Sequence, residues 1–160
     1  MNFIFLILTG FIIGIAAVIA VAVIVIRTRM VVAHRCARNF TETCATIEKT
    51  VPTVEGWGFP IKTWNFYETF AQKNLVPEGF VNLKVFFVCN ANLASRMLSE
   101  NPAFVGMMPC SWAVYEMTDG SVWLSKLNID LMSKVFSGVT GQMMRKVAHA
   151  DNHFLAKVLG

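Results

Sequence analysis

The chain has 160 residues, of which 55% are hydrophobic and 15% are charged, and its formal net charge is +4. This length allows one domain together with a short additional segment. All ten acidic residues lie at Glu42 or later, and that part of the chain also carries ten Lys and Arg. The domain is therefore neutral, and nothing in its charge indicates binding to DNA or RNA.

The N-terminal segment is strongly apolar. Residues 3–26 contain no charged residue, and in a helix these 24 residues span about 36 Å, against a hydrocarbon core of roughly 30 Å. A signal peptide has a shorter apolar core preceded by basic residues, whereas here no Lys or Arg precedes the run and Arg27 and Arg29 follow it. Residues 1–28 are therefore predicted to form an uncleaved transmembrane anchor.

Small residues recur within this predicted helix. Gly10, Gly14 and Ala17 lie three or four residues apart, a spacing that allows a second helix to approach closely in lipid. The alternative is that Gly and Ala are simply common in membrane helices. On the first interpretation, these three residues contact another membrane-protein subunit or a second copy of the chain.

The excess positive charge lies just after the anchor. Residues 29–38 are predicted to be a basic juxtamembrane linker, and Arg27, Arg29, Arg35 and Arg38 are expected to contact lipid head groups. Because positive charge accumulates on the cytoplasmic side, these arginines predict a single-pass protein of the bacterial inner membrane with its C-terminal domain in the cytoplasm.

Residues 39–160 alternate between helical and strand patterns. Asn39 and Glu42 resemble a capping box, and Asp119-Gly120 between two apolar runs is typical of a hairpin. We expect helices at 39–51, 66–70, 93–98 and 139–158, and strands at 58–64, 81–89, 110–117 and 121–127. The strand at 81–89 is expected to be covered on both faces. The pattern predicts one α+β domain with an antiparallel sheet and helices packed on one face.

Three segments of this domain resemble a known family. They are Cys89-Asn90 followed by Leu93-Ala94 and Met97-Leu98; Asn101-Pro102 followed by Met107-Met108-Pro109-Cys110; and the strand 112–116 followed by Asp119-Gly120. Together with Gly58-Phe59, they resemble the domain of unknown function 302 family over residues 39–160. The resemblance implies a β-α-β4-α fold and implies no particular activity.

Two cysteines are candidates for ligand binding. Cys89 ends one predicted strand and Cys110 begins the next, so the two thiols are expected at one end of the sheet, beside Met107 and Met108. Thiolates and thioethers together suit Cu(I), and a reactive thiol could also handle sulfur. The alternative is that these residues belong to the apolar core.

His149 and His153 form a weaker candidate for a metal site. They lie four residues apart on the predicted C-terminal helix, which is the spacing of some zinc sites, but the sequence shows no third ligand. The alternative is a solvent-facing surface of the helix.

No catalytic motif of the common hydrolase, nucleotide-binding or dinucleotide-binding families is present. We therefore expect a non-catalytic, membrane-anchored accessory subunit or interaction module of a larger membrane complex. The alternative is a membrane-tethered protein that handles a soft metal, haem or sulfur through Cys89 and Cys110. The sequence requires no cofactor, and the expected partners are lipids, other membrane-protein subunits or a second copy of the chain, but not nucleic acid.

Overall fold

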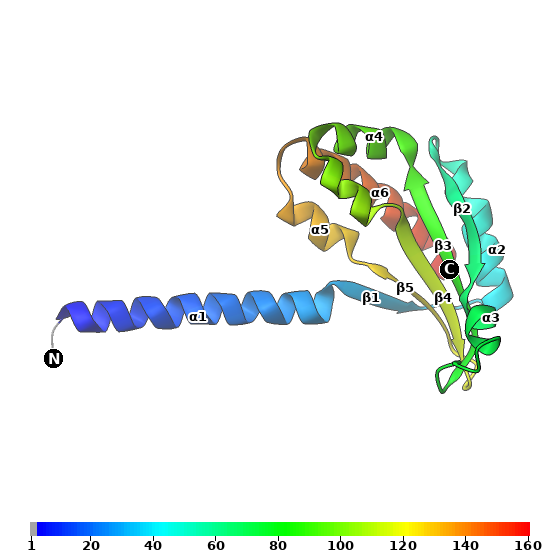
Figure 1. The fold of residues 1–160 in the computed structure, drawn as a ribbon, viewed down its shortest axis with the longest axis horizontal. Coiled ribbons are helices and arrows are strands. Elements are labelled where there is room, and N and C mark those ends of the chain that lie inside the picture. The colour runs from blue at the N-terminus through cyan, green and yellow to red at the C-terminus, as the bar shows by residue number, and fades with distance from the viewer. Residues whose placement is uncertain (1–2) are drawn as a thin grey trace. The chain divides into compact units, whose positions relative to one another are not determined.

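The computed structural model describes residues 3–160, which divide into two units, one ending at Met30 and the other spanning Val31–Gly160 (Figure 1). The first unit is the helix α1 (Phe3–Arg29). Its segment Ile7–Arg29 has a mean hydropathy of 2.9, and none of its residues is buried. Such a helix is long and apolar enough to cross a membrane, although an N-terminal signal sequence can meet the same criteria of length and composition.

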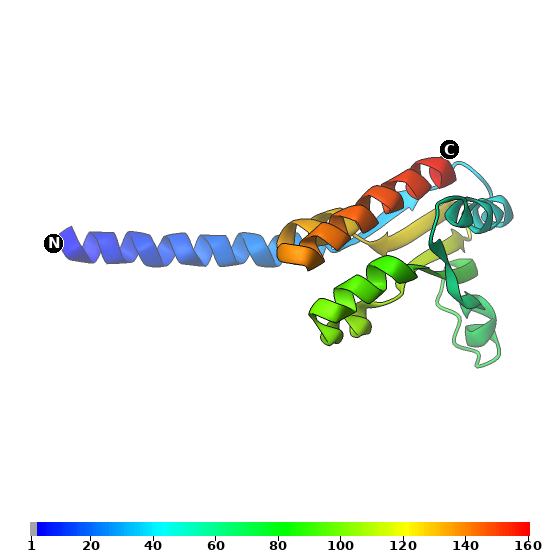
Figure 2. The ribbon, with the colours of Figure 1, turned by 90° about the horizontal axis from the view of Figure 1, so that it is seen from above.

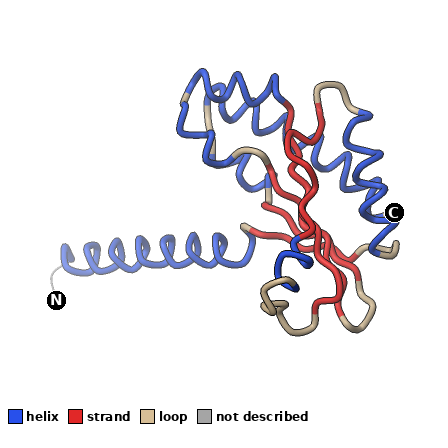
Figure 3. Tube along the Cα trace, turned by 45° about the vertical axis from the view of Figure 1, so that its right-hand side comes forward, coloured by secondary structure: helices blue, strands red, loops and turns tan. Residues whose placement is uncertain are grey.

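The second unit is an α+β domain built on a five-stranded antiparallel sheet with the strand order β1-β5-β4-β3-β2 (Figures 1 and 3). The strands are β1 (Val31–Arg35), β2 (Trp57–Asn65), β3 (Phe80–Asn90), β4 (Cys110–Met117) and β5 (Val122–Leu127). The helices are α2 (Phe40–Thr50), α3 (Phe66–Ala71), α4 (Ala91–Glu100), α5 (Ile129–Val135) and α6 (Gly138–Leu159), with short 3-10 turns η1 (Val51–Thr53) and η2 (Pro102–Met107). The predicted fold class is confirmed.

The predicted linker at 29–38 is wrong, because most of it belongs to the folded domain. Residues 31–35 form the edge strand β1, which pairs with β5 from Val31 opposite Leu127 to Arg35 opposite Trp123. This edge strand has only five residues, as is common for edge strands, and so short a run is hard to recognise from its sequence. Farther along, Arg38 donates from Nη1 to the carbonyl oxygen of Val158 (2.8 Å) at the C-terminal end of α6. Arg38 thus satisfies a helix end.

The core lies on one face of the sheet, which α2 and α6 cover (Figure 2). Ile47 of α2, Phe86 and Val114 of the sheet and Phe154 of α6 are fully buried in it. Alternate residues of β3 point to the opposite face, where Phe87 is only half-buried. The expectation that this strand is covered on both faces is therefore wrong.

The C-terminal region contains two helices where the sequence pattern predicts one. The predicted helix corresponds to α6, and the separate helix α5 precedes it. The Asn128 side chain caps α5 by accepting a hydrogen bond from the amide of Leu131 (3.0 Å). Gly138, with φ of +60°, lies at the break between the two helices.

Gly141 marks the tight junction between α5 and α6. A Cβ atom there would lie 2.3 Å from the carbonyl oxygen of Phe136, which is backbone and cannot rotate away. We expect Gly141→Ala to destabilise the full chain by about 1–3 kcal/mol, because overpacking outweighs the higher helix propensity of alanine. Urea unfolding in detergent would measure this change. Gly106→Ala is the control, because nothing lies within 4 Å of its added Cβ; equal stability of the two variants would contradict the prediction.

Candidate functional site

Asn90, the last residue of β3, forms hydrogen bonds to two neighbouring segments at one end of the sheet. Its side-chain oxygen accepts hydrogen bonds from the amides of Asn92 and Leu93 (both 3.1 Å) and so caps α4. Its amide group donates to the carbonyl oxygen of Glu55 (3.3 Å), beside the start of β2. The same residue thus holds α4 and the β2 entrance together where β4 begins.

A small cavity at this end of the sheet has walls that are rich in sulfur. It offers about 50 Å³ of room for water-sized molecules. Seven of its fifteen lining residues carry sulfur, and we call it the sulfur-lined cavity: Cys89, Met97, Met107, Met108, Cys110, Met132 and Met144. The remaining lining is almost entirely apolar, and Met107 is 37% exposed, so the wall reaches the surface.

The structure brings the four predicted sulfur residues, Cys89, Cys110, Met107 and Met108, to this single cavity. The two cysteines do not approach it in the same way. Cys110 pairs with Val88 in the β3–β4 register and so points to the core face of the sheet. Cys89 follows Val88 in β3 and so points to the opposite face. Cys89 accordingly also borders an open groove on the other side. Cys110 is the inner thiol and Cys89 the outer one.

Both thiols are held in an environment that favours their protonated form. Burial, followed by the negative charges of Asp151 and Cys89, raises the pKa of Cys110 to about 11, and only Lys126 opposes this shift. Burial also raises the pKa of Cys89. At neutral pH the unliganded cavity therefore contains thiols rather than thiolates, which disfavours a nucleophilic role.

We expect Cys110 in the unliganded full chain to react slowly with iodoacetamide at neutral pH. Because only the thiolate reacts and the pKa is about 11, the rate should rise about tenfold per pH unit between roughly pH 7 and 10. Mass spectrometry of the Cys110 peptide after timed pulses would measure it. In urea all four cysteines should react alike; fast, pH-independent labelling of the folded chain would contradict the prediction.

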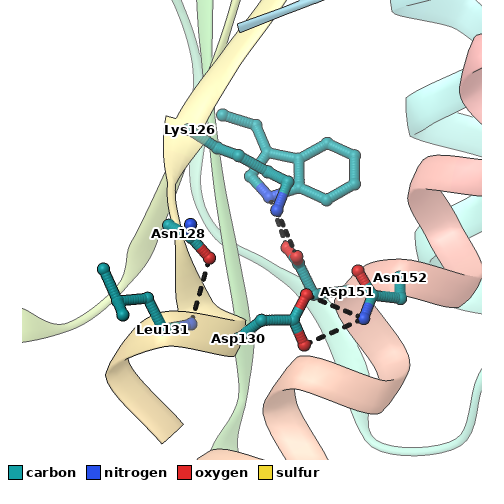
Figure 4. Close-up of polar contacts among 7 residues, drawn as sticks. Lys126, Asn128, Asp130, Leu131, Asp151 and Asn152 are labelled. Atoms are coloured by element: carbon teal, nitrogen blue, oxygen red, sulfur yellow. Dashed lines mark hydrogen bonds and ion pairs between the residues drawn. The ribbon is translucent and has the colours of Figure 1, made fainter. Parts of the chain in front are cut away.

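A buried ion pair lies near Cys110 of the sulfur-lined cavity. Figure 4 shows this pair and the polar contacts around it. Lys126 of β5 and Asp151 of α6 are 6% and 5% exposed, and the lysine Nζ donates to Asp151 Oδ2. Trp112 Nε1 donates to the other carboxylate oxygen (3.0 Å). Burial raises the pKa of Asp151, although Lys126 and Trp112 partly oppose the shift. Next to the pair, Asn152 Nδ2 donates to both carboxylate oxygens of Asp130 (3.0 Å each), which links α6 to α5.

This ion pair is not among the sites predicted from the sequence, although the pattern contains a signal for it. Lys126 has the same parity in its strand as the buried Val122 and Leu124. Asp151 lies three residues before Phe154 on the buried side of α6. A charged residue at each of two inward positions is the signal, because buried charges need a partner.

The remaining histidines and cysteines lie elsewhere. His149 and His153 are both exposed on α6, and among residues 3–160 no three His, Cys, Asp or Glu side chains are placed to share a metal. Cys36 and Cys44 are buried in the core, and the four cysteines of the chain are free thiols. The role of the two histidines as metal ligands stays a prediction that this geometry does not support.

On α1, Gly10 and Gly14 lie in one shallow groove, lined also by Phe11, Ile15, Val18 and Ile19. Ala17 lies outside this groove. Its walls are exposed apolar side chains, so the glycines form a notch on an otherwise bulky helix.

Comparison with known proteins identifies the family. The sequence profile of the Domain of unknown function DUF302 matches residues 32–159, nearly the whole domain. A search among curated proteins finds no match. The fold is similar to the crystal structure of an uncharacterized conserved protein DUF302 from Bacillus stearothermophilus, with a TM-score of 0.68 and 18% identity over 81% of this chain and 98% of that one. The chain therefore belongs to the DUF302 family, and its α+β domain has the fold of that family.

Proposed function

We propose that this protein is a membrane-tethered, non-catalytic domain that binds one Cu(I) ion in the sulfur-lined cavity. The single observation that carries the proposal is the cavity wall, where two thiols and five thioethers surround a space of about 50 Å³. Soft sulfur ligands select soft monovalent copper over hard cations such as Mg²⁺ or Ca²⁺.

The size of the cavity favours a metal ion over a haem. Pockets for cofactor-sized molecules occupy about 300–1,000 Å³, so a haem does not fit this space. The raised pKa values of Cys89 and Cys110 disfavour nucleophilic sulfur chemistry. Thioethers need no deprotonation, so Met107 and Met108 can bind copper while the cavity stays apolar.

Within this proposal the two cysteines have different roles. Cys110, the inner thiol, would be the charged ligand, because a metal ion that binds there would displace the thiol proton to the solvent. Cys89, which also borders the open groove, would be the second sulfur ligand at the outer side of the cavity. The thioethers of the wall complete the set of soft ligands.

Competition with a Cu(I)-chelating dye under reducing conditions tests the proposal on the full chain in detergent. We expect one Cu(I) per chain, and Cys110→Ser should weaken binding by more than about 100-fold. Even residues that only contact a metal ligand lower metal affinity by about 10–100-fold when they are replaced. Cys36→Ala, a buried cysteine outside the cavity, should leave the affinity unchanged. A wild-type chain that binds Cu(I) no better than the double variant Cys89→Ser/Cys110→Ser would refute the proposal.

The notch on α1 favours a second candidate function, that of an accessory subunit held in the bacterial inner membrane by a partner helix. Gly10 and Gly14 create the groove that such a helix would fill. Arg27 and Arg29 at the end of α1 support a cytoplasmic location of the domain. A protease added to the outside of spheroplasts should therefore leave the domain intact, and its digestion would refute this orientation.

Crosslinking in native membranes tests the partner helix. Gly10→Leu or Gly14→Leu should abolish a crosslinked complex, whereas Ala16→Leu, on the opposite side of α1, should preserve it. A protein that is monomeric before and after these changes would contradict the accessory role. A complex of two identical chains would instead assign the groove to a homo-oligomer.

A further inference from the structure

The domain exposes a set of apolar side chains at the end of the sheet that bears the sulfur-lined cavity. We call this set the apolar rim; its members, with their exposed fractions, are Val31 (60%), Val105 (61%), Met107 (37%), Leu127 (36%) and Val135 (73%). Large exposed apolar groups scattered singly are normal on a protein surface, but a contiguous group marks an interaction site.

The rim residues come from four elements that reach the same end of the sheet. Val31 of β1 pairs with Leu127 of β5, and Leu127 and Met107 line the same cavity. The rings of Phe104 and Phe136, 5.3 Å apart, join η2 to the end of α5, so the chain segments that carry Val105 and Val135 lie close together. The α4 and α5 helices lie at this same end of the sheet (Figure 1).

The connection between α1 and β1 is short, which determines where Val31 of the rim lies when α1 spans a membrane. Only Met30 separates Arg29, the last residue of α1, from Val31. Because consecutive Cα atoms are about 3.8 Å apart, Val31 lies within about 8 Å of the end of the helix in any arrangement of the two units. The 27 residues of α1 span about 40 Å, close to the full thickness of a bilayer with its head groups. Val31 therefore emerges at the head-group layer.

We propose that the apolar rim rests on the lipid surface, so that the sulfur-lined cavity faces the membrane. The inference requires that α1 remains in the bilayer, and it holds whether or not the cavity binds copper. The basic residues Arg27, Arg29 and Lys134 flank the rim residues in the chain, and apolar groups with basic neighbours are what a membrane interface favours. A ligand of the cavity would then enter or leave at the membrane surface.

Photo-crosslinking of the full chain in phosphatidylcholine vesicles tests this inference. A benzophenone amino acid placed at Val105 or Val135 should form adducts with phospholipid, detected by mass. The matched control is Leu75, which is 62% exposed in the loop that precedes β3, at the opposite end of the sheet. We expect several-fold more lipid adduct at the two rim positions than at position 75. All three side chains are exposed, so the substitutions remove no core contact.

Equal adduct yields at the three positions would overturn the inference, as would crosslinks between two copies of the chain from the rim positions. The test uses no metal, so its outcome is independent of the copper titration.

Discussion

Asp151→Ala is expected to lower the free energy of unfolding of the full chain by about 3–5 kcal/mol, because it leaves the Lys126 ammonium buried without its partner. The indole of Trp112 loses its hydrogen-bond acceptor in the same variant. Both partners of the ion pair are almost fully buried, so water cannot replace the carboxylate. The change is a large part of the total stability of a domain, which is typically about 5–15 kcal/mol. Urea unfolding in detergent, followed by tryptophan fluorescence, would measure it.

Two further variants separate the buried charge from a general loss of packing. The double variant Lys126→Met/Asp151→Leu should recover most of the lost stability, because apolar replacements of a buried ion pair are often neutral or stabilising. Asp130→Ala removes a neighbouring but exposed carboxylate and should cost less than about 1 kcal/mol. If Asp151→Ala proved as mild as Asp130→Ala, the ion pair would not be buried as described.

Phe154→Ala is also expected to lower the free energy of unfolding of the full chain by about 3–5 kcal/mol. The Phe154 ring is fully buried between α6 and the sheet. Its centroid lies 5.4 Å from that of Trp57 and 6.5 Å from that of Trp112, both in edge-to-face geometry. The truncation removes the ring and opens a cavity beneath both tryptophans. The same unfolding measurement applies, with a shift in tryptophan emission as an independent sign of the changed environment.

Phe154→Leu is the matched control, because leucine keeps most of the apolar volume. It should cost clearly less than the alanine variant, since the loss grows with the volume of the cavity left behind. Similar losses for the two variants would mean that the ring-to-ring contacts, and not the filled volume, hold this part of the core.

Local patterns of the sequence determine much of the architecture of this protein. The uncharged run of α1, the helices α2 and α6 and the strands β3, β4 and β5 follow from hydrophobic periodicity and length, which are properties of neighbouring residues. The neutral charge of the domain follows from counting. The segments that resemble the DUF302 family likewise indicate the fold of the domain. The sequence also places Cys89 and Cys110 at strand ends, where they can approach each other.

Only the tertiary structure decides the features that join distant segments. Residues 31–35 become a strand because β5 offers an edge for pairing, and a run of five residues is too short to indicate it alone. Arg38 leaves the expected lipid surface because the end of α6, 120 residues away, presents unpaired carbonyl groups. Lys126 and Asp151 meet because packing brings two inward positions together. Likewise, the sulfur-lined cavity has walls from many elements, so its size and the depth of each thiol depend on long-range packing that no local pattern encodes.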